Sequence, residues 1–157
     1  MDIQIQEKHT INCDATAFIP DRWTVAEHQK AGQFEWDPER IQLYLNKSQQ
    51  NYGYPSGKKL WKELRSKQVL NANVLDYLLK NPYLIPEEWK KHTKTIEDWS
   101  AINHILFWGT IYRDSQSRLC VRSLSFFGKP WPGSFHLNDE YNQFQFAAIL
   151  RNSKYSK

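Results

Sequence analysis

The residues best suited to chemistry in this 157-residue chain are scattered and fall into no catalytic motif. The closest approach to a metal site is the stretch from His136 to Glu140, which also contains Asp139. On a strand, His136 and Glu140 share one face and Asp139 points to the other, whereas catalytic metal sites normally use three protein ligands. The sequence therefore predicts no catalytic residue, no metal site and no cofactor.

A second acidic group carries the Glu-x-Lys spacing of nuclease cores, at Glu88 and Lys90, with Asp76 upstream as a further candidate ligand. The preceding Pro86 and its two following acids are more typical of a helix N-terminus than of a nuclease strand. A small metal-dependent hydrolase or nuclease is therefore the alternative prediction. Its candidate residues are His136, Asp139, Glu140 and Glu88.

The two cysteines, Cys13 and Cys120, lie far apart and form no CxxC pair, which fits a reducing compartment. Neither has a base beside it in sequence, so neither is expected to be a nucleophile. The first residues lack the apolar region of a signal peptide, and no run approaches the ~18 apolar residues of a membrane span. The sequence therefore predicts a cytoplasmic protein that does not insert into membranes.

A basic face is predicted on a helix over residues 57–67, which Ser56 would cap. Lys58, Lys62 and Arg65 recur at i, i+4 and i+7, so they lie along one side of that helix. Such a stripe usually only solvates a helix, but it also suits contacts with phosphates. The net charge of +4 and the pI of about 9.0 are compatible with an anionic partner without requiring one.

The chain is rich in aromatic residues, with 7 Trp, 8 Tyr and 8 Phe. Tryptophan is seldom fully buried, so some of these rings are expected at the surface. We expect a hairpin of strands over residues 104–113 and 119–127, in which Arg113 lies opposite Arg118. This register places Phe107 and Leu124 together on a buried face.

The opposite face of that hairpin then carries Trp108 and Tyr112 beside small polar residues. Together with Trp131, on the loop predicted over residues 128–133, these rings form a half-exposed aromatic platform. Aromatic rings beside basic side chains are the combination that stacks single-stranded bases, and the same platform would also suit a protein partner.

The remaining patterns predict further short elements. A second helix is expected over residues 73–80, ended by Asn81 and Pro82, and a helical turn follows Pro86. A brief helix is expected over residues 24–30, with strands over 33–36, 40–45 and 134–141. These elements predict an α+β fold in which two or three short helices pack on one face of a small, mainly antiparallel sheet with a C-terminal meander. Residues 1–150 would form one domain and residues 151–157 a polar tail.

Part of the chain resembles a family of small uncharacterised bacterial proteins. The resemblance covers roughly residues 10–127 and rests on three strings: DATAFIPDRWTVAEHQKAGQFEWDP, LNANVLDYLLKNPYLIPEEWK and FWGTIYRDS. Against that family, residues 91–103 read as an insertion. The resemblance implies a bacterial protein and carries no activity or site residue. The sequence thus favours a non-catalytic binding or accessory protein of bacterial type, whose partner is a protein or a single-stranded nucleic acid.

Overall fold

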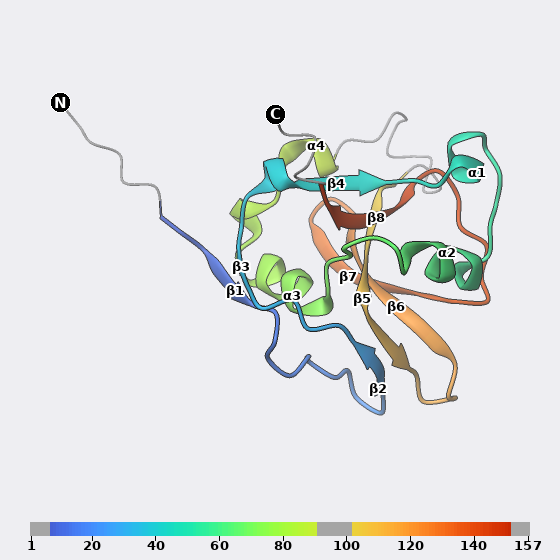
Figure 1. Ribbon diagram of the computed structural model, residues 1–157, viewed down its shortest axis with the longest axis horizontal. Coiled ribbons are helices and arrows are strands. Elements are labelled where there is room, and N and C mark those ends of the chain that lie inside the picture. Colours follow the sequence, from blue (N-terminus) through green and yellow to red (C-terminus); the bar gives the residue numbers. More distant parts are fainter. Residues whose placement is uncertain (1–6, 91–101, 152–157) are drawn as a thin grey trace.

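A six-stranded sheet organises the fold (Figure 1), which a computed structural model describes for residues 7–90 and 102–151. In spatial order its strands are β4 (Ile41–Tyr44), β8 (Gln145–Leu150), β5 (His104–Arg113), β6 (Leu119–Phe126) and β7 (Pro130–His136), and β2 (Thr24–His28) pairs with the end of β5. Neighbouring strands are antiparallel except β5 and β8. A separate pair joins β1 (Thr10–Asn12) to β3 (Gln33–Glu35).

The helices are short and begin and end where local signals place them. They are α1 (Lys47–Gln50), α2 (Gly57–Leu64), α3 (Ala72–Lys80) and α4 (Glu87–Lys90), with 3-10 turns at Pro38–Arg40 and Pro82–Leu84. The side chain of Ser56 accepts a hydrogen bond from the N–H of Lys59 and caps α2, and Asn71 caps α3 in the same way. The α+β class and these two helices are therefore confirmed.

The two longer helices lie on opposite sides of β5 (Figure 1). Successive side chains of a strand point to opposite faces, so Phe107 and Trp108 enter different core clusters. The cluster around Phe107 includes Leu75 and Leu78 of α3. The cluster around Trp108 instead includes Leu60 and Leu64 of α2. Both faces of β5 are therefore buried.

The predicted hairpin register is wrong, although its two strands are correct. Arg113 lies opposite Leu119 rather than Arg118, and the register shifts again between Leu106 and Ile111. The turn is longer than expected because Asp114 accepts hydrogen bonds from two backbone N–H groups within it, which belong to Gln116 and Arg118. Phe107 and Leu124 are both buried as predicted, but Leu124 lies opposite Ile105.

The shift in β5 has a packing cause at Gly109. Its N–H donates to the carbonyl of Leu70 and its own carbonyl accepts from Gln29, so two other segments approach this point. A Cβ placed on Gly109 would lie 2.8 Å from the Cα of Asn71. Only glycine fits here, because the start of α3 presses directly against the strand.

Strand β7 corrects the prediction of a loop over residues 128–133. Proline is excluded from central strands because it has no N–H to donate, but it is tolerated at a sheet edge. β7 is the edge strand beyond β6. The N–H of Leu137 donates to the carbonyl of Leu119 on β6. Successive backbone N atoms of a strand point alternately toward and away from its neighbour, so the N atoms of Pro130 and Pro132 point away from β6. The two prolines thereby protect this edge from pairing with another chain.

A second correction concerns residues 24–30, where a short helix was expected. This segment contains β2, which pairs with β5 and has a bulge between Val25 and Glu27. Pairing with a ten-residue strand outweighs a weak helix-start pattern. The strand predicted over residues 40–45 is confirmed as β4.

Two other sequence features lie largely outside the described part of the chain. They are residues 152–157 of the polar tail and residues 91–101 of the segment over 91–103 that reads as an insertion. Among the described helices, none has the length and apolar character needed to cross a membrane.

Candidate nucleic-acid interface

The aromatic sheet face predicted as a binding surface is covered. Trp108 is 2% exposed and Tyr112 is fully buried, so the prediction that these two rings are presented to a partner is wrong. Leu60 and Leu64 of α2 belong to the same core cluster as Trp108. The ring of Tyr112 meets Trp23 edge-on, with the ring centroids 5.5 Å apart.

Trp131 alone of the three predicted rings lies at the surface, where it is 50% exposed. It stands on the edge strand β7, directly opposite Ser125 of β6. The edge position explains its exposure, because no strand of the described residues lies beyond β7.

The predicted basic face is exposed on α2. Lys58 and Lys62 lie on the helix and Arg65 is its C-cap, and all three side chains face solvent. None of the three forms an ion pair within the described residues. The opposite side of α2 is held on the sheet by its leucines, so the helix presents these cations outward.

Positive charge is concentrated around this helix. Between residues 47 and 67 the chain has six lysines and arginines and a single acid, Glu63. The net charge of this segment is therefore more positive than the net charge of the whole protein, +4. The local field at this end of the molecule favours an anionic partner. Glu63 itself accepts a hydrogen bond from the amide of Asn46, which ties the start of α1 to α2.

Aromatic side chains are close to these cations in the chain. Tyr52 is 73% exposed and Tyr54 is 63% exposed, and both stand on the loop between α1 and α2 (Figure 1). The Arg65 guanidinium carbon lies 4.8 Å from the centroid of the Trp61 ring. The six residues that we call the basic–aromatic surface are Lys58, Lys62, Arg65, Lys67, Tyr52 and Tyr54. The surface pairs phosphate-binding cations with rings on which bases can stack.

A second cation of this surface rests on an aromatic face. The ammonium of Lys67 lies 4.6 Å from the centroid of the Tyr44 ring. In the described part of the chain, the ring nitrogen of Trp61 is a buried N–H without a hydrogen-bond partner, and its burial keeps it out of reach of a ligand on the surface.

Sequence reasoning missed Tyr52 and Tyr54, although a signal for them was present. They stand in the loop segment NYGYPSG, whose Gly, Pro and Ser exclude a periodic element with a buried face. Two large rings on such a loop have no core to enter.

The residues of the alternative hydrolase prediction are not brought together. His136 lies against Asp114, with Nε2 and Oδ2 3.0 Å apart, and Asp139 is farther from the ring, 3.9 Å from Nδ1. Glu88 lies on α4, and Asp76 binds Arg122 instead of facing Glu88. Within residues 7–90 and 102–151 no three His, Cys, Asp or Glu side chains gather as metal ligands.

Asp114 itself has a structural part in the hairpin turn. Burial by itself raises the pKa of this carboxyl. The hydrogen bonds from the Arg118 backbone, His136 and the Gln116 backbone outweigh that effect and hold the pKa well below its ordinary value. The carboxylate is therefore ionised at neutral pH and fixes the turn.

The two cysteines are buried thiols. Burial raises the pKa of Cys13 to about 11, with a further contribution from Asp14, and burial raises the pKa of Cys120 to about 12. Both stay protonated at neutral pH and lack the thiolate that nucleophilic attack requires.

One serine and one histidine lie at hydrogen-bond distance. Nδ1 of His104 is 2.6 Å from the hydroxyl of Ser125, and burial lowers the pKa of His104 to about 4. Ser125 is buried. A histidine with so low a pKa is a poor general base at neutral pH, so the pair serves packing rather than nucleophilic catalysis.

His104 gives the protein a dependence on mild acid. The unfolded chain binds a proton at pH 6.5, whereas folded His104 does so only near pH 4, so stability falls as the pH drops between these values. As the pH drops from 6.5 to 4, the free energy of unfolding should fall in both proteins. We expect this fall to be smaller by roughly 1–3 kcal/mol in His104→Gln than in the parent. Urea unfolding at a series of pH values measures this difference, and parallel curves for the two proteins would contradict it.

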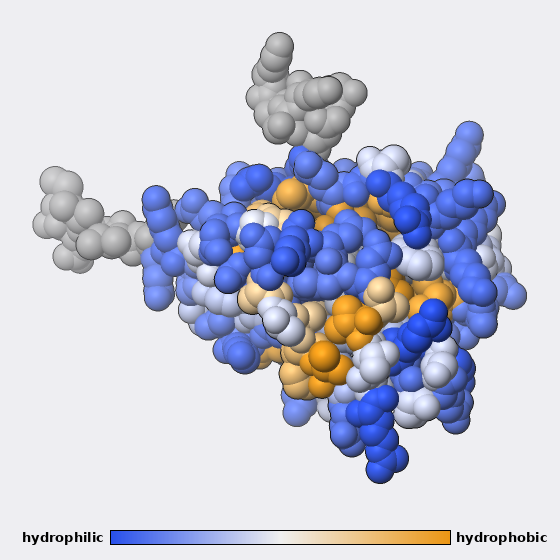
Figure 2. All heavy atoms as spheres, turned by 60° about the horizontal axis from the view of Figure 1, so that its bottom comes forward, coloured by the Kyte–Doolittle hydropathy of each residue, from blue (hydrophilic) through white to orange (hydrophobic). Residues whose placement is uncertain are grey.

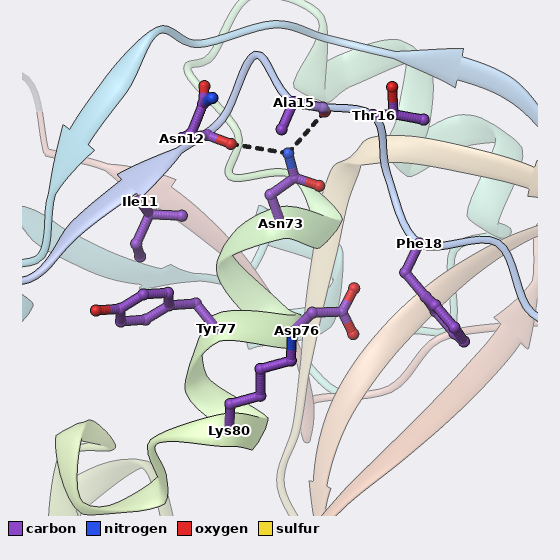
Figure 3. Close-up of a pocket in the computed structure, with 9 residues that line it drawn as sticks. All are labelled: Ile11, Asn12, Ala15, Thr16, Phe18, Asn73, Asp76, Tyr77 and Lys80. Atoms are coloured by element: carbon purple, nitrogen blue, oxygen red, sulfur yellow. Dashed lines mark hydrogen bonds between the residues drawn. The ribbon is translucent and has the colours of Figure 1, made fainter.

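A pocket of about 250 Å³ lies on the far side of the sheet from α2, between α3 and the chain that joins β1 to β2 (Figure 3). The amide nitrogen of Asn73 bonds two carbonyls of that chain, those of Asn12 at 3.0 Å and Ala15 at 2.9 Å. On the same connection Phe18 and Ile19 are exposed. Figure 2 shows that apolar side chains gather in a patch on the face that it presents.

Comparison of the chain with protein-family models, with curated proteins and with solved structures finds no match.

Proposed function

We propose that this chain is a non-catalytic binding protein whose basic–aromatic surface takes a single-stranded nucleic acid. The observation that carries the proposal is a set of exposed cations on α2, without ion pairs in the described part of the chain, directly after a loop with two exposed tyrosines, Tyr52 and Tyr54. Cations alone would suit any polyanion. Exposed rings add a preference for bases that are free to stack, which a duplex does not offer.

The expected energetics combine two contributions. Each stacked base is worth roughly 1–3 kcal/mol, and each neutralised phosphate adds to the salt dependence of binding. The resemblance to a bacterial family and the two free buried cysteines support a bacterial protein of the cytoplasm.

A protein partner is the second candidate. Phe18 is 58% exposed, and its neighbour Ile19 is also exposed. The loop that holds them is fixed, because the hydroxyl of Tyr112 donates to the carbonyl of Phe18 and Arg122 lies over the Phe18 ring. Exposed apolar side chains on a preorganised loop are typical of protein contacts.

Substitution of the two tyrosines tests the stacking half of the proposal. We expect Tyr52→Ala/Tyr54→Ala to weaken binding of a fluorescein-labelled oligothymidine by roughly tenfold or more, since each ring stacks a base. Fluorescence anisotropy measures the change. The thermal unfolding temperature should stay near that of the parent because both side chains are exposed.

Charge reversal tests the electrostatic half. Lys62→Glu/Arg65→Glu should abolish most of the binding at low salt. The matched control is Lys8→Glu/Lys30→Glu, which makes the same change in net charge at two exposed lysines away from α2. Equal weakening by both pairs would show that the protein binds only through its overall charge.

A further inference from the structure

The pocket between α3 and the connection from β1 to β2 holds a set of groups that the proposed nucleic-acid site does not use. Its polar lining includes Asn73, Asp76, Lys80 and Thr16, and its apolar walls include Phe18 and Tyr77. Figure 3 shows these side chains around one space, with Phe18 on one side and Tyr77 on the other.

The charge of Asp76 is already balanced. Each of its two carboxylate oxygens accepts a hydrogen bond from the guanidinium of Arg122, both at 2.9 Å. A cationic ligand would have to compete with this bidentate pair.

The remaining charge at the pocket is positive. Lys80 lies one helical turn after Asp76 and, in Figure 3, its side chain runs back along α3 toward it. Lys80 forms no ion pair within the described residues. A ligand with an anionic group therefore finds a free ammonium there.

Asn73 supplies an oriented acceptor. Its amide nitrogen is held by the carbonyls of Asn12 and Ala15, which fixes which side-chain atom is nitrogen. The side-chain oxygen then points away from them, toward the side of the pocket where Thr16 and Phe18 lie (Figure 3). An N–H group of a ligand would satisfy this oxygen.

The pocket is of a size that suits a small group. Its volume of about 250 Å³ is enough for one residue of a peptide. A peptide C-terminus presents the required set in one residue: a carboxylate, a backbone N–H and a side chain.

From these contacts we propose that the pocket binds the C-terminal residue of a peptide with an apolar last side chain. The carboxylate pairs with Lys80, the N–H donates to Asn73 and the side chain lies between Phe18 and Tyr77. Capture of a terminal carboxylate is an established mode of peptide recognition. This site is separate from the basic–aromatic surface and does not depend on it.

The test uses the whole protein labelled with nitrogen-15 and two probes, acetyl-Ala-Leu with a free carboxylate and the same dipeptide with a C-terminal amide. We expect the acid to cause saturable NMR shifts at the lining residues and the amide to bind about tenfold more weakly, because it lacks one charge-assisted contact. Equal binding of acid and amide, or no saturable shift with the acid, would overturn the proposal.

Variants of the lysine sharpen the result. Lys80→Met should weaken the acid by about tenfold, Lys80→Arg should retain it because the charge remains, and Lys30→Met serves as the control at an exposed lysine outside the pocket. The comparison of acid and amide needs no variant, so it holds even if Lys80→Met fails to fold. Loss of binding in Lys30→Met as well would contradict a specific role for Lys80.

Discussion

Replacement of Asp76 by alanine is expected to destabilise the protein by about 3 kcal/mol, because it leaves the Arg122 guanidinium buried without its partner. The side chain of Arg122 is only 7% exposed, and Asp76 meets it with two hydrogen bonds. Chemical denaturation at neutral pH measures the change in the free energy of unfolding.

A double variant separates the ion pair from the loss of packing. Asp76→Ala/Arg122→Met removes the charge together with its partner, so it should recover part of the stability lost in Asp76→Ala. If Arg122→Met lowers the free energy of unfolding as much in the Asp76→Ala background as in the parent, the unpaired buried charge is not the cause of the loss in Asp76→Ala.

Replacement of Phe107 by alanine is expected to cost about 3–5 kcal/mol, because it leaves a cavity in the cluster that joins β5 to α3. Phe107 is completely buried. Urea denaturation with Tyr83→Ala as the control tests this, since Tyr83 is exposed and its truncation should change stability little. A loss below about 1 kcal/mol would contradict the placement of Phe107 in the core.

Much of the fold follows from local sequence signals. Ser56 and Asn71 cap the two longer helices and Pro82 lies outside α3, because these residue types act through their own backbone neighbourhood. The strand from His104 to Arg113 follows from its apolar residues and was placed correctly.

The hairpin register depends on contacts that no local signal contains. Its shift occurs where Leu70 and Gln29 bond Gly109, and those residues are far away in sequence. A glycine within a strand marks a close approach of some backbone but does not say which segment approaches.

The exposure of Trp108 could not be decided from the strand alone. Alternation correctly placed Phe107 and Trp108 on opposite faces, yet it does not say whether each face is covered. The docking of Leu60 and Leu64 of α2 onto the Trp108 face is a tertiary contact that the strand pattern does not contain. Helix α2 on that face buries the ring.

The basic half of the candidate site followed from spacing, whereas its aromatic half did not. Lys58, Lys62 and Arg65 share a helix face by periodicity, and the structure leaves that face exposed. Tyr52 and Tyr54 join it only because the loop before α2 lies at the same end of the fold.

The most direct test of the nucleic-acid proposal is the salt dependence of oligothymidine binding by the parent and by Lys62→Glu/Arg65→Glu. If about three phosphates are neutralised, log K should fall with log salt with a slope near −2, and the charge-reversed protein should have a clearly flatter slope. The parent should also prefer the single strand to a duplex of equal length, because Tyr52 and Tyr54 need unstacked bases. Absence of binding at low salt, or an equal slope in the two proteins, would contradict the account.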